Sequence, residues 1–266
     1  MSADICARHA EFLRSCSSSE LAAEIAAPDR LRLAETRVGS KPLVTAWAPF
    51  EHVNPQARIV LVGLTPGRKQ MGDALAEARR LLRAGASEAE AKAGAKVHAS
   101  FAGPMRSNLV AMLDQMGVAA LLGLNSAGAL WGHASHLAQF TSVLRNPVFV
   151  DGKNYSGAPH PVTTPFLFEQ VRRWFAPEAA RLRHALFVPL GPKVTEAVEA
   201  VADEAGLDRD RILSGLPHPS GANAERIAYF LGRKPREALS AKVAPDRLDA
   251  VRRDLDARIR RIGGAL

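Results

Sequence analysis

The chain has little cysteine and no long apolar run. Its 266 residues hold two cysteines, Cys6 and Cys16, which excludes a four-thiolate metal site or iron–sulfur cluster. We expect no metal, no cofactor and a reducing, cytoplasmic setting. No stretch is apolar enough to cross a bilayer and no signal-peptide pattern is present, so we expect a soluble protein with no membrane partner.

Acidic side chains are in the minority. Lys and Arg number 35 against 27 Asp and Glu, a net charge of +8 with a pI near 10. An excess of this size favours a polyanionic partner through attraction and counterion release. Because 47% of the residues are hydrophobic, the chain has enough apolar side chains to form one core. We expect a monomer with a single domain over residues 1–266.

A short uncharged run at residues 59–62 is the clearest strand signal. Its Ile-Val-Leu-Val sequence is typical of a strand buried on both faces of a parallel sheet. The run stops at Gly63, and Pro66-Gly67 predicts a turn at the carboxyl edge of that sheet, where open α/β sheets bind ligands.

Further elements follow from periodicity and from start and stop signals. We expect 1–57 to be an N-terminal helical wrap whose part after residue 27 is irregular, 58–234 to be a core with an insertion at 68–100, and 235–266 to be a C-terminal helix. Strands are predicted at 139–144, 185–190 and 211–213, and helices at 73–83, 88–97, 104–117, 165–175, 193–205, 223–232 and 246–262.

Strands separated by helices predict an α/β fold. We expect a three-layer α/β/α arrangement with a central, mostly parallel four-stranded sheet and extra helices at both termini. Such a sheet places the turn at Gly63–Gly67 and the loop that begins at His218 along one edge, so the two loops are expected to meet.

Four segments occur in a telling order along the chain. They are Gly63-Leu64-Thr65-Pro66-Gly67, Phe101-Ala102-Gly103-Pro104-Met105-Arg106, Phe140-Thr141-Ser142-Val143 and His218-Pro219-Ser220. In this order they resemble the uracil-DNA glycosylase superfamily, as a divergent member without an iron–sulfur cluster. Each pattern alone also has an ordinary structural interpretation, such as a tight turn or a loop histidine, and the order of the four is what makes the resemblance specific.

The resemblance implies a reaction, the hydrolysis of the bond between uracil and deoxyribose after the nucleotide leaves the duplex. It implies that His218, as a neutral imidazole, donates to the developing oxyanion of the leaving base, and that Thr65 holds the attacking water. Backbone at Gly63 and Leu64, the ring of Phe101 and the hydroxyl of Ser142 are expected to bind the base.

The resemblance also implies a DNA-binding surface. The expected partners are uracil-containing DNA, double- or single-stranded, and the abasic-site product. Arginines in the 68–100 insertion are expected to clamp DNA. The expected DNA-binding residues are Arg68, Lys69, Ser220, Gly221, Ala222 and Asn223.

The sequence departs from the family pattern at two positions and leaves alternatives open. Leu64 and Thr65 stand where an acidic or amide side chain holds water, and Ser142 stands where an asparagine reads uracil, so Asn146 or Asn154 could supply the amide. One alternative is a catalytically weak or inactive DNA-binding protein on the same fold. Another is a phosphate- or nucleotide-binding enzyme, although no Lys-Ser/Thr follows the glycines. His160 is expected near the pocket.

Overall fold

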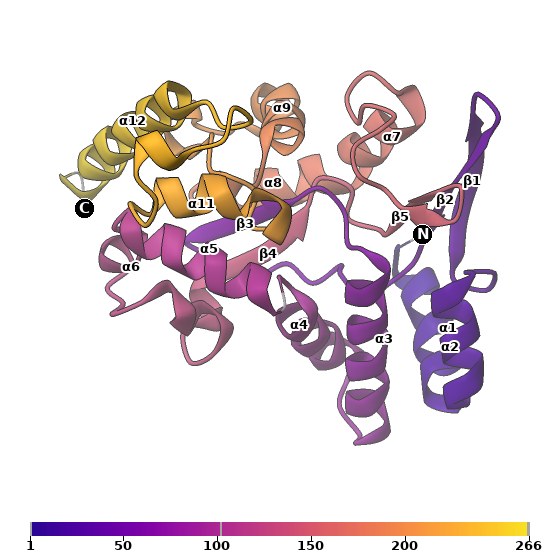
Figure 1. The fold of residues 1–266 in the computed structure, drawn as a ribbon. Coiled ribbons are helices and arrows are strands. Elements are labelled where there is room, and N and C mark those ends of the chain that lie inside the picture. The colour runs from indigo at the N-terminus through magenta and orange to yellow at the C-terminus, as the bar shows by residue number, and fades with distance from the viewer. Residues whose placement is uncertain (1, 102, 265–266) are drawn as a thin grey trace. The chain divides into compact units, whose positions relative to one another are not determined.

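The computed structural model describes residues 2–101 and 103–264, which form a mixed α/β protein (Figure 1). The chain divides into two compact units, and each unit is assembled from three separate segments. Unit 1 comprises Met1–Val53, Leu64–Ser100 and Phe140–Glu178, and unit 2 comprises Asn54–Gly63, Phe101–Gln139 and Ala179–Leu266.

Unit 1 contains a four-stranded antiparallel sheet in the order β1-β2-β5-β6. The prediction that residues 28–57 are irregular is wrong, because β1 and β2 form a hairpin there. Alternating exposure along β1 is the period-2 signal that the four prolines of this segment obscured. The strands are β1 (Arg32–Val38), β2 (Lys41–Ala46), β5 (Val148–Val150) and β6 (Lys153–Asn154).

Two helices of unit 1 begin where their caps predict, whereas α3 begins at Arg68, five residues before its predicted start at 73. Ser17 with Glu20 and Ser87 with Glu90 each form a reciprocal capping box, which satisfies two backbone N–H groups at the helix start. Helix α3 packs against α1, α2 and α4 (Figure 1). The helices are α1 (Ser2–Ser15), α2 (Ser18–Ala26), α3 (Arg68–Arg83), α4 (Glu88–Ala99) and α7 (Pro165–Gln170), which continues as a π-helical turn (Val171–Phe175).

A buried ion pair joins two helical segments of unit 1. The Lys96 ammonium lies 3.4 Å from Glu178 Oε1, and the two side chains are 3% and 2% exposed. Lys96 also donates to the His52 carbonyl oxygen at 2.6 Å. Burial lowers the pKa of Lys96, and the nearby Glu178 opposes that shift. Each charge is tolerated in the interior because the other is there.

Unit 2 holds the parallel strands. β3 (Ile59–Gly63) pairs in parallel with β7 (Leu186–Pro189). The third strand of this sheet is β4 (Ala138–Ser142), whose residues from Phe140 onward belong to unit 1, and the strand order is β4-β3-β7. The expected strand at 211–213 is reduced to one parallel bridge between Ile212 and Phe187. Residues 209–211 take a 3-10 turn instead, which Asp208 caps, so too few residues remain for a strand.

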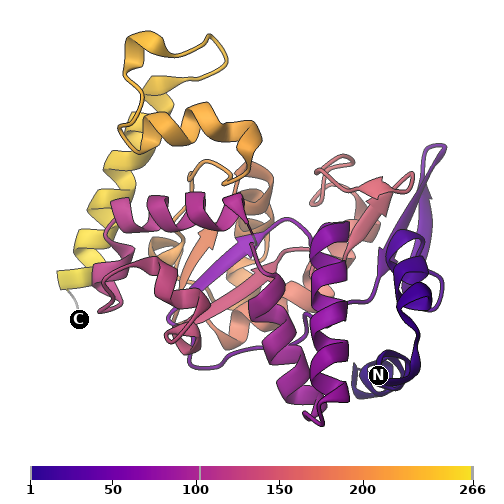
Figure 2. The same cartoon turned by 60° about the horizontal axis from the view of Figure 1, so that its bottom comes forward.

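Helices cover this sheet and pack on one another. Helix α12 packs against α11 and α6 (Figure 2) and buries Leu248, Leu255 and Ile259. The helices of this part are α5 (Pro104–Gln115), α6 (Val118–Leu121), α9 (Pro192–Ala200), α10 (Ala202–Ala205), α11 (Ala224–Phe230) and α12 (Pro245–Gly264). Helix α8 (Ala176–Arg181) belongs to unit 1 up to Glu178 and to unit 2 from Ala179. Within the described residues, no helix combines the length and the apolar character needed to cross a membrane.

Gly215 tests how α12 packs. Its φ is +102°, and a Cβ there would lie 2.8 Å from both Cγ atoms of Val251 in α12. Gly123, at φ +72° with nothing within 4 Å of an added Cβ, is the matched control for backbone strain alone. We expect Gly123→Ala to lower the free energy of unfolding by about 1 kcal/mol and Gly215→Ala by about 2–4 kcal/mol, because only the second adds a clash. Urea denaturation measures both, and equal losses would contradict this packing.

Candidate functional site

The carboxyl ends of β3 and β7 lie side by side in unit 2. Val62 pairs with Pro189, and Leu190 N donates to the Val62 carbonyl oxygen at 2.9 Å. Buried Gly63 and Gly191 therefore follow their strands at the same edge. A Cβ on Gly191, whose φ is +102°, would lie 3.7 Å from His218 Cβ, so the His218 loop packs closely over this turn.

His218 is half-buried in a defined tautomer. Its Nδ1 accepts a hydrogen bond from Ser220 N at 3.3 Å, so in the neutral ring the proton is on Nε2. Burial lowers the pKa of His218 below its ordinary value near 6.5. The result is a neutral imidazole whose Nε2–H can donate a hydrogen bond at pH 7.

A residue that the sequence analysis missed fixes this loop. Asn108 in α5 donates from Nδ2 to the Pro219 carbonyl oxygen at 2.9 Å. A proline carbonyl next to the candidate histidine cannot shift without breaking this bond. The sequence offered one hint of Asn108, a polar amide in a predicted helix that begins at Pro104, three residues after Phe101.

The segment after His218 differs from its expected form. Asn223 is the N-cap residue of α11, but its side chain makes no cap bond to that helix. Its Nδ2 lies 3.4 Å from Ser220 Oγ, and its Oδ1 accepts from Arg226 at 3.0 Å, which uses the amide elsewhere. Gly221 and Ala222 are exposed. With only seven residues, α11 is a poor phosphate site, so the expected DNA role of these residues stays a prediction.

Phe101 begins the second family-like segment and is 7% exposed. Its φ is +50°, an unusual conformation for a bulky side chain. The buried ring already contacts protein, and stacking on a base stays a prediction. Ala102 lies outside the described residues.

Thr65 belongs to unit 1, where its hydroxyl is engaged by the backbone. Oγ1 donates to the Asn146 carbonyl oxygen at 3.1 Å and accepts from Val148 N at 3.2 Å. The preceding residue is fixed as well, because the Leu64 carbonyl oxygen accepts from Leu144 N at 3.0 Å. The turn is therefore held against the segment that follows β4, and one lone pair of Thr65 remains for a water.

The two candidate amides differ in their surroundings. Asn154 is exposed, and its Oδ1 accepts from Arg68 N at 2.9 Å. Asn146 is 5% exposed, and its Nδ2 has no hydrogen-bond partner among the described residues. Ser142 is half-buried at the end of β4. An unsatisfied buried donor is unusual in a folded protein, and Asn146 is therefore the stronger of the two.

Arg68 is held inside unit 1. Its guanidinium donates to the carbonyl oxygens of Ile25 and Ala26 and, at 2.8 Å, to that of Gly152, and it lies 4.3 Å from the Phe149 ring centroid. These intramolecular contacts explain the position of the Arg68 side chain without any bound DNA. Lys69 is different, because its ammonium is exposed and pairs with Asp73 at 2.6 Å.

The other arginines of α3 also make internal contacts. Arg79 and Arg83 donate to the Cys16 carbonyl oxygen at 2.7 and 2.8 Å, and Arg83 reaches the Arg14 carbonyl oxygen at 3.0 Å. Cations suit this place because the last carbonyl groups of a helix lack partners and carry partial negative charge. The arginines expected to clamp DNA thus join α3 to the end of α1.

His160 in unit 1 repeats the pattern seen at His218. Val162 N donates to His160 Nδ1 at 3.3 Å, again within a His-Pro turn. Its place beside a pocket, and the meeting of the Gly63–Gly67 turn with the His218 loop, stay predictions. Among the described residues, no group of three His, Cys, Asp or Glu is placed to hold a metal ion.

Comparison with known proteins gives one informative relative. The uncharacterized protein YoxB of Bacillus subtilis (strain 168) is 35% identical over 198 residues, which cover 73% of this chain and 75% of YoxB. The chain belongs to the YoxB family. No protein-family model matches it. No solved structure matches it.

Arg68 and Lys69 are adjacent cations of this YoxB-family protein, and their contributions to the free energy of unfolding can be compared. We expect Arg68→Ala to lower the free energy of unfolding by about 2–4 kcal/mol, because three carbonyl bonds and a ring contact are lost. Lys69→Ala, which removes only an exposed pair, should change it by less than about 0.5 kcal/mol. Urea unfolding monitored by circular dichroism gives both values. A stable Arg68→Ala protein would contradict the structural role.

Proposed function

We propose that this protein is a DNA glycosylase that hydrolyses the N-glycosidic bond of uracil in DNA and leaves an abasic site. The base departs with the bonding electron pair, and water adds its oxygen to the sugar C1′ and loses a proton. The single observation that carries the proposal is the neutral, half-buried imidazole of His218, held at the carboxyl edge of β3 and β7. The ordered resemblance of the four sequence segments supports the same reaction.

A neutral donor such as the His218 imidazole can stabilise the transition state of base release. Negative charge grows on the leaving base, and a preorganised N–H donor stabilises it by about 3–4 kcal/mol in comparable sites. The His218 ring is already oriented by Ser220 N, and Asn108 holds the adjoining carbonyl group. Little reorganisation is then needed as the reaction proceeds.

Asn146 is the side chain that we assign to reading the base, in place of Ser142. Uracil presents carbonyl oxygens, and the free Nδ2 of Asn146 is a donor of the required kind. Thr65 would accept or position the attacking water through its remaining lone pair. A flipped base would satisfy a buried polar atom that the protein itself leaves without a partner.

The second candidate function is DNA binding with weak or absent catalysis. It is favoured by Thr65, whose hydroxyl proton is committed to the Asn146 carbonyl oxygen. A hydroxyl so engaged is a poor base. A single-turnover assay on uracil-containing oligonucleotides, with cleavage of the abasic product, separates the two functions.

The finer fold expectation belongs to the same proposal. A mostly parallel four-stranded sheet between two helical layers would require Ile212 to extend its bridge to β7 into a fourth strand. The bridge is parallel, as that topology requires.

His218→Ala should slow base release by about two to three powers of ten, because one donor to the developing charge is lost. DNA affinity should hardly change, since the bond strengthens mainly in the transition state. His133→Ala, an exposed histidine of the same unit, is the control. Single-turnover excision with saturating enzyme gives the rates, and a His218→Ala protein of wild-type rate would remove His218 from the site.

The pH dependence has a defined sign. The folded-state pKa of His218 is lowered, so the donor stays neutral at pH 7 and excision should persist above it. Activity should fall on the acid side as the ring protonates. His218 should also lower stability as pH falls through the window below its ordinary pKa near 6.5, because the unfolded chain then binds the proton first. A rate that requires protonated histidine would contradict this mechanism.

Asn146→Leu tests the reading amide. We expect excision to slow by about tenfold or more, the usual effect of one lost hydrogen bond of 1–2 kcal/mol. Folding stability should change little, because the removed donor has no partner in the protein. Asn154→Leu, which alters the exposed amide, is the control. Normal excision by Asn146→Leu together with slow excision by Asn154→Leu would reverse the assignment.

A further inference from the structure

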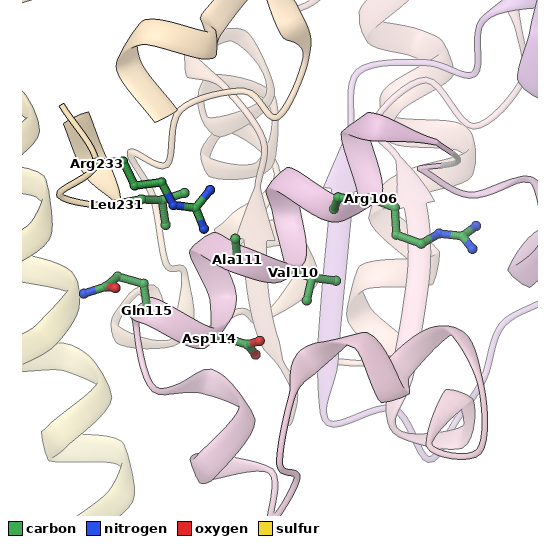
Figure 3. A pocket seen from close by; sticks show the side chains of 8 residues that line it. Arg106, Val110, Ala111, Asp114, Gln115, Leu231 and Arg233 are labelled. Carbon is green, nitrogen blue, oxygen red and sulfur yellow. The ribbon is translucent and has the colours of Figure 1, made fainter. Parts of the chain in front are cut away.

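We propose that a groove along α5 in unit 2 binds a DNA strand by its sugar–phosphate backbone. The proposal rests on the proposed function, because it supplies that function with a DNA contact surface absent from the sequence analysis. The groove has a volume of about 760 Å³ and is open to solvent. Its lining includes Arg106, Val110, Ala111, Asp114, Gln115 and Arg233 (Figure 3).

The spacing of these residues makes the groove elongated. Arg106, Val110 and Asp114 follow each other at four-residue steps, as do Ala111 and Gln115, so they occupy one face of α5. Nine residue steps from Arg106 to Gln115 correspond to about 13 Å along the helix axis. A face of this length can contact more than one phosphate of a single strand.

The charges of the groove favour an anion. Arg233 is exposed, and its guanidinium makes no hydrogen bond or ion pair within residues 2–101 and 103–264. In Figure 3 its side chain extends from the segment after α11 toward α5. Arg106, near the start of α5, lies 5.3 Å from the Trp131 ring centroid, and in Figure 3 its guanidinium points away from Arg233, so Arg233 is the cation that faces the groove.

The one carboxylate that lines the groove is used within the protein. Asp114 Oδ2 accepts from Ser126 Oγ at 2.8 Å, and Oδ1 accepts from Ala127 N at 2.6 Å. These bonds hold it toward the 126–127 segment and reduce its repulsion of an incoming phosphate.

The floor of the groove argues for a backbone rather than a protein partner. Its apolar lining consists of Val110, Ala111 and Leu231, and the groove is open to solvent rather than enclosed, unlike the buried pockets that hold aromatic anchors at protein interfaces. An open surface with an exposed arginine suits phosphates, which give affinity without sequence selection.

Helix α5 also connects the groove with the candidate site. Asn108, two residues after Arg106 and three before Ala111, holds the Pro219 carbonyl oxygen next to His218. A strand contacting this helix would bind the element that fixes the catalytic loop, all within unit 2.

The test compares charge changes inside the groove with identical changes outside it. The groove variants are Arg233→Ala and Gln115→Lys. Their controls are Arg253→Ala and Gln56→Lys, which alter exposed residues of the same unit outside the groove lining. The readout is the Kd for a uracil-free duplex oligonucleotide from about 50 to about 200 mM salt, where phosphate contacts are most evident.

We expect Arg233→Ala to weaken binding about threefold or more and to reduce the slope of log K against log salt by about 1. Gln115→Lys should tighten binding and increase that slope. The two controls should show smaller effects. Groove variants that match their controls would overturn the groove and leave the proposed function standing when wild type still excises uracil. A wild-type protein that binds no DNA would overturn both.

Discussion

The parallel pairing of β3 with β7 is the constraint on which the candidate site depends. Parallel strands direct their carboxyl ends to the same edge, so Gly63 and Gly191 emerge side by side. Every residue of both strands is buried, which requires cover on the sheet faces and helical connections between strands. The left-handed turn at Gly191 then leaves room for His218 to lie over it. An alanine at Gly191 would strain the backbone, whereas its Cβ would only reach ordinary van der Waals contact with that histidine.

Unit 1 depends instead on neutralised charge. Lys96 and Glu178 face each other in the interior, and Arg145 stacks 4.3 Å from the Trp174 ring centroid. Burial lowers the pKa of Arg145, while Glu51 and Glu178 oppose the shift. Four charged groups therefore support one another where none would be stable alone.

Unsatisfied polar atoms are concentrated at the end of β4 and in the segment that follows it. Thr141 Oγ1, Arg145 Nε and Asn146 Nδ2 are buried without hydrogen-bond partners among the described residues. Such atoms cost free energy unless a ligand or water satisfies them. These atoms lie next to the Leu64–Gly67 turn, which bonds to the same segment through Thr65. A ligand bound at this turn would satisfy them and remove that free-energy cost.

Much of the fold could be predicted from local signals. Capping boxes at Ser17 and Ser87 and the apolar run at 59–62 mark their elements directly, because the same residues create the structure. The β1–β2 hairpin was missed because prolines and charged residues suggested an irregular segment, whereas pairing with β5 stabilises it. The fourth strand failed because a cap at Asp208 favoured a tight turn. Asn108 was missed because only the tertiary fold brings it to Pro219.

Sequence charge, finally, is a poor measure of the surface that a partner meets. The net charge of +8 includes Arg68, Arg79 and Arg83, whose guanidiniums all bind backbone carbonyl groups. A guanidinium in that state retains its field but has fewer N–H groups left for phosphate, and moving it would break the packing of α3 against its neighbours. Direct phosphate contacts must therefore come from cations without internal partners. Arg233 meets that condition, and its segment is held in place because Lys234 and Ser240 both bind Glu225, which lowers the pKa of that carboxyl to about 2. A preference for polyanions, as the net charge suggests, would therefore have to act through cations that lack internal partners. Arg233 is such a cation, and it faces solvent in the groove along α5.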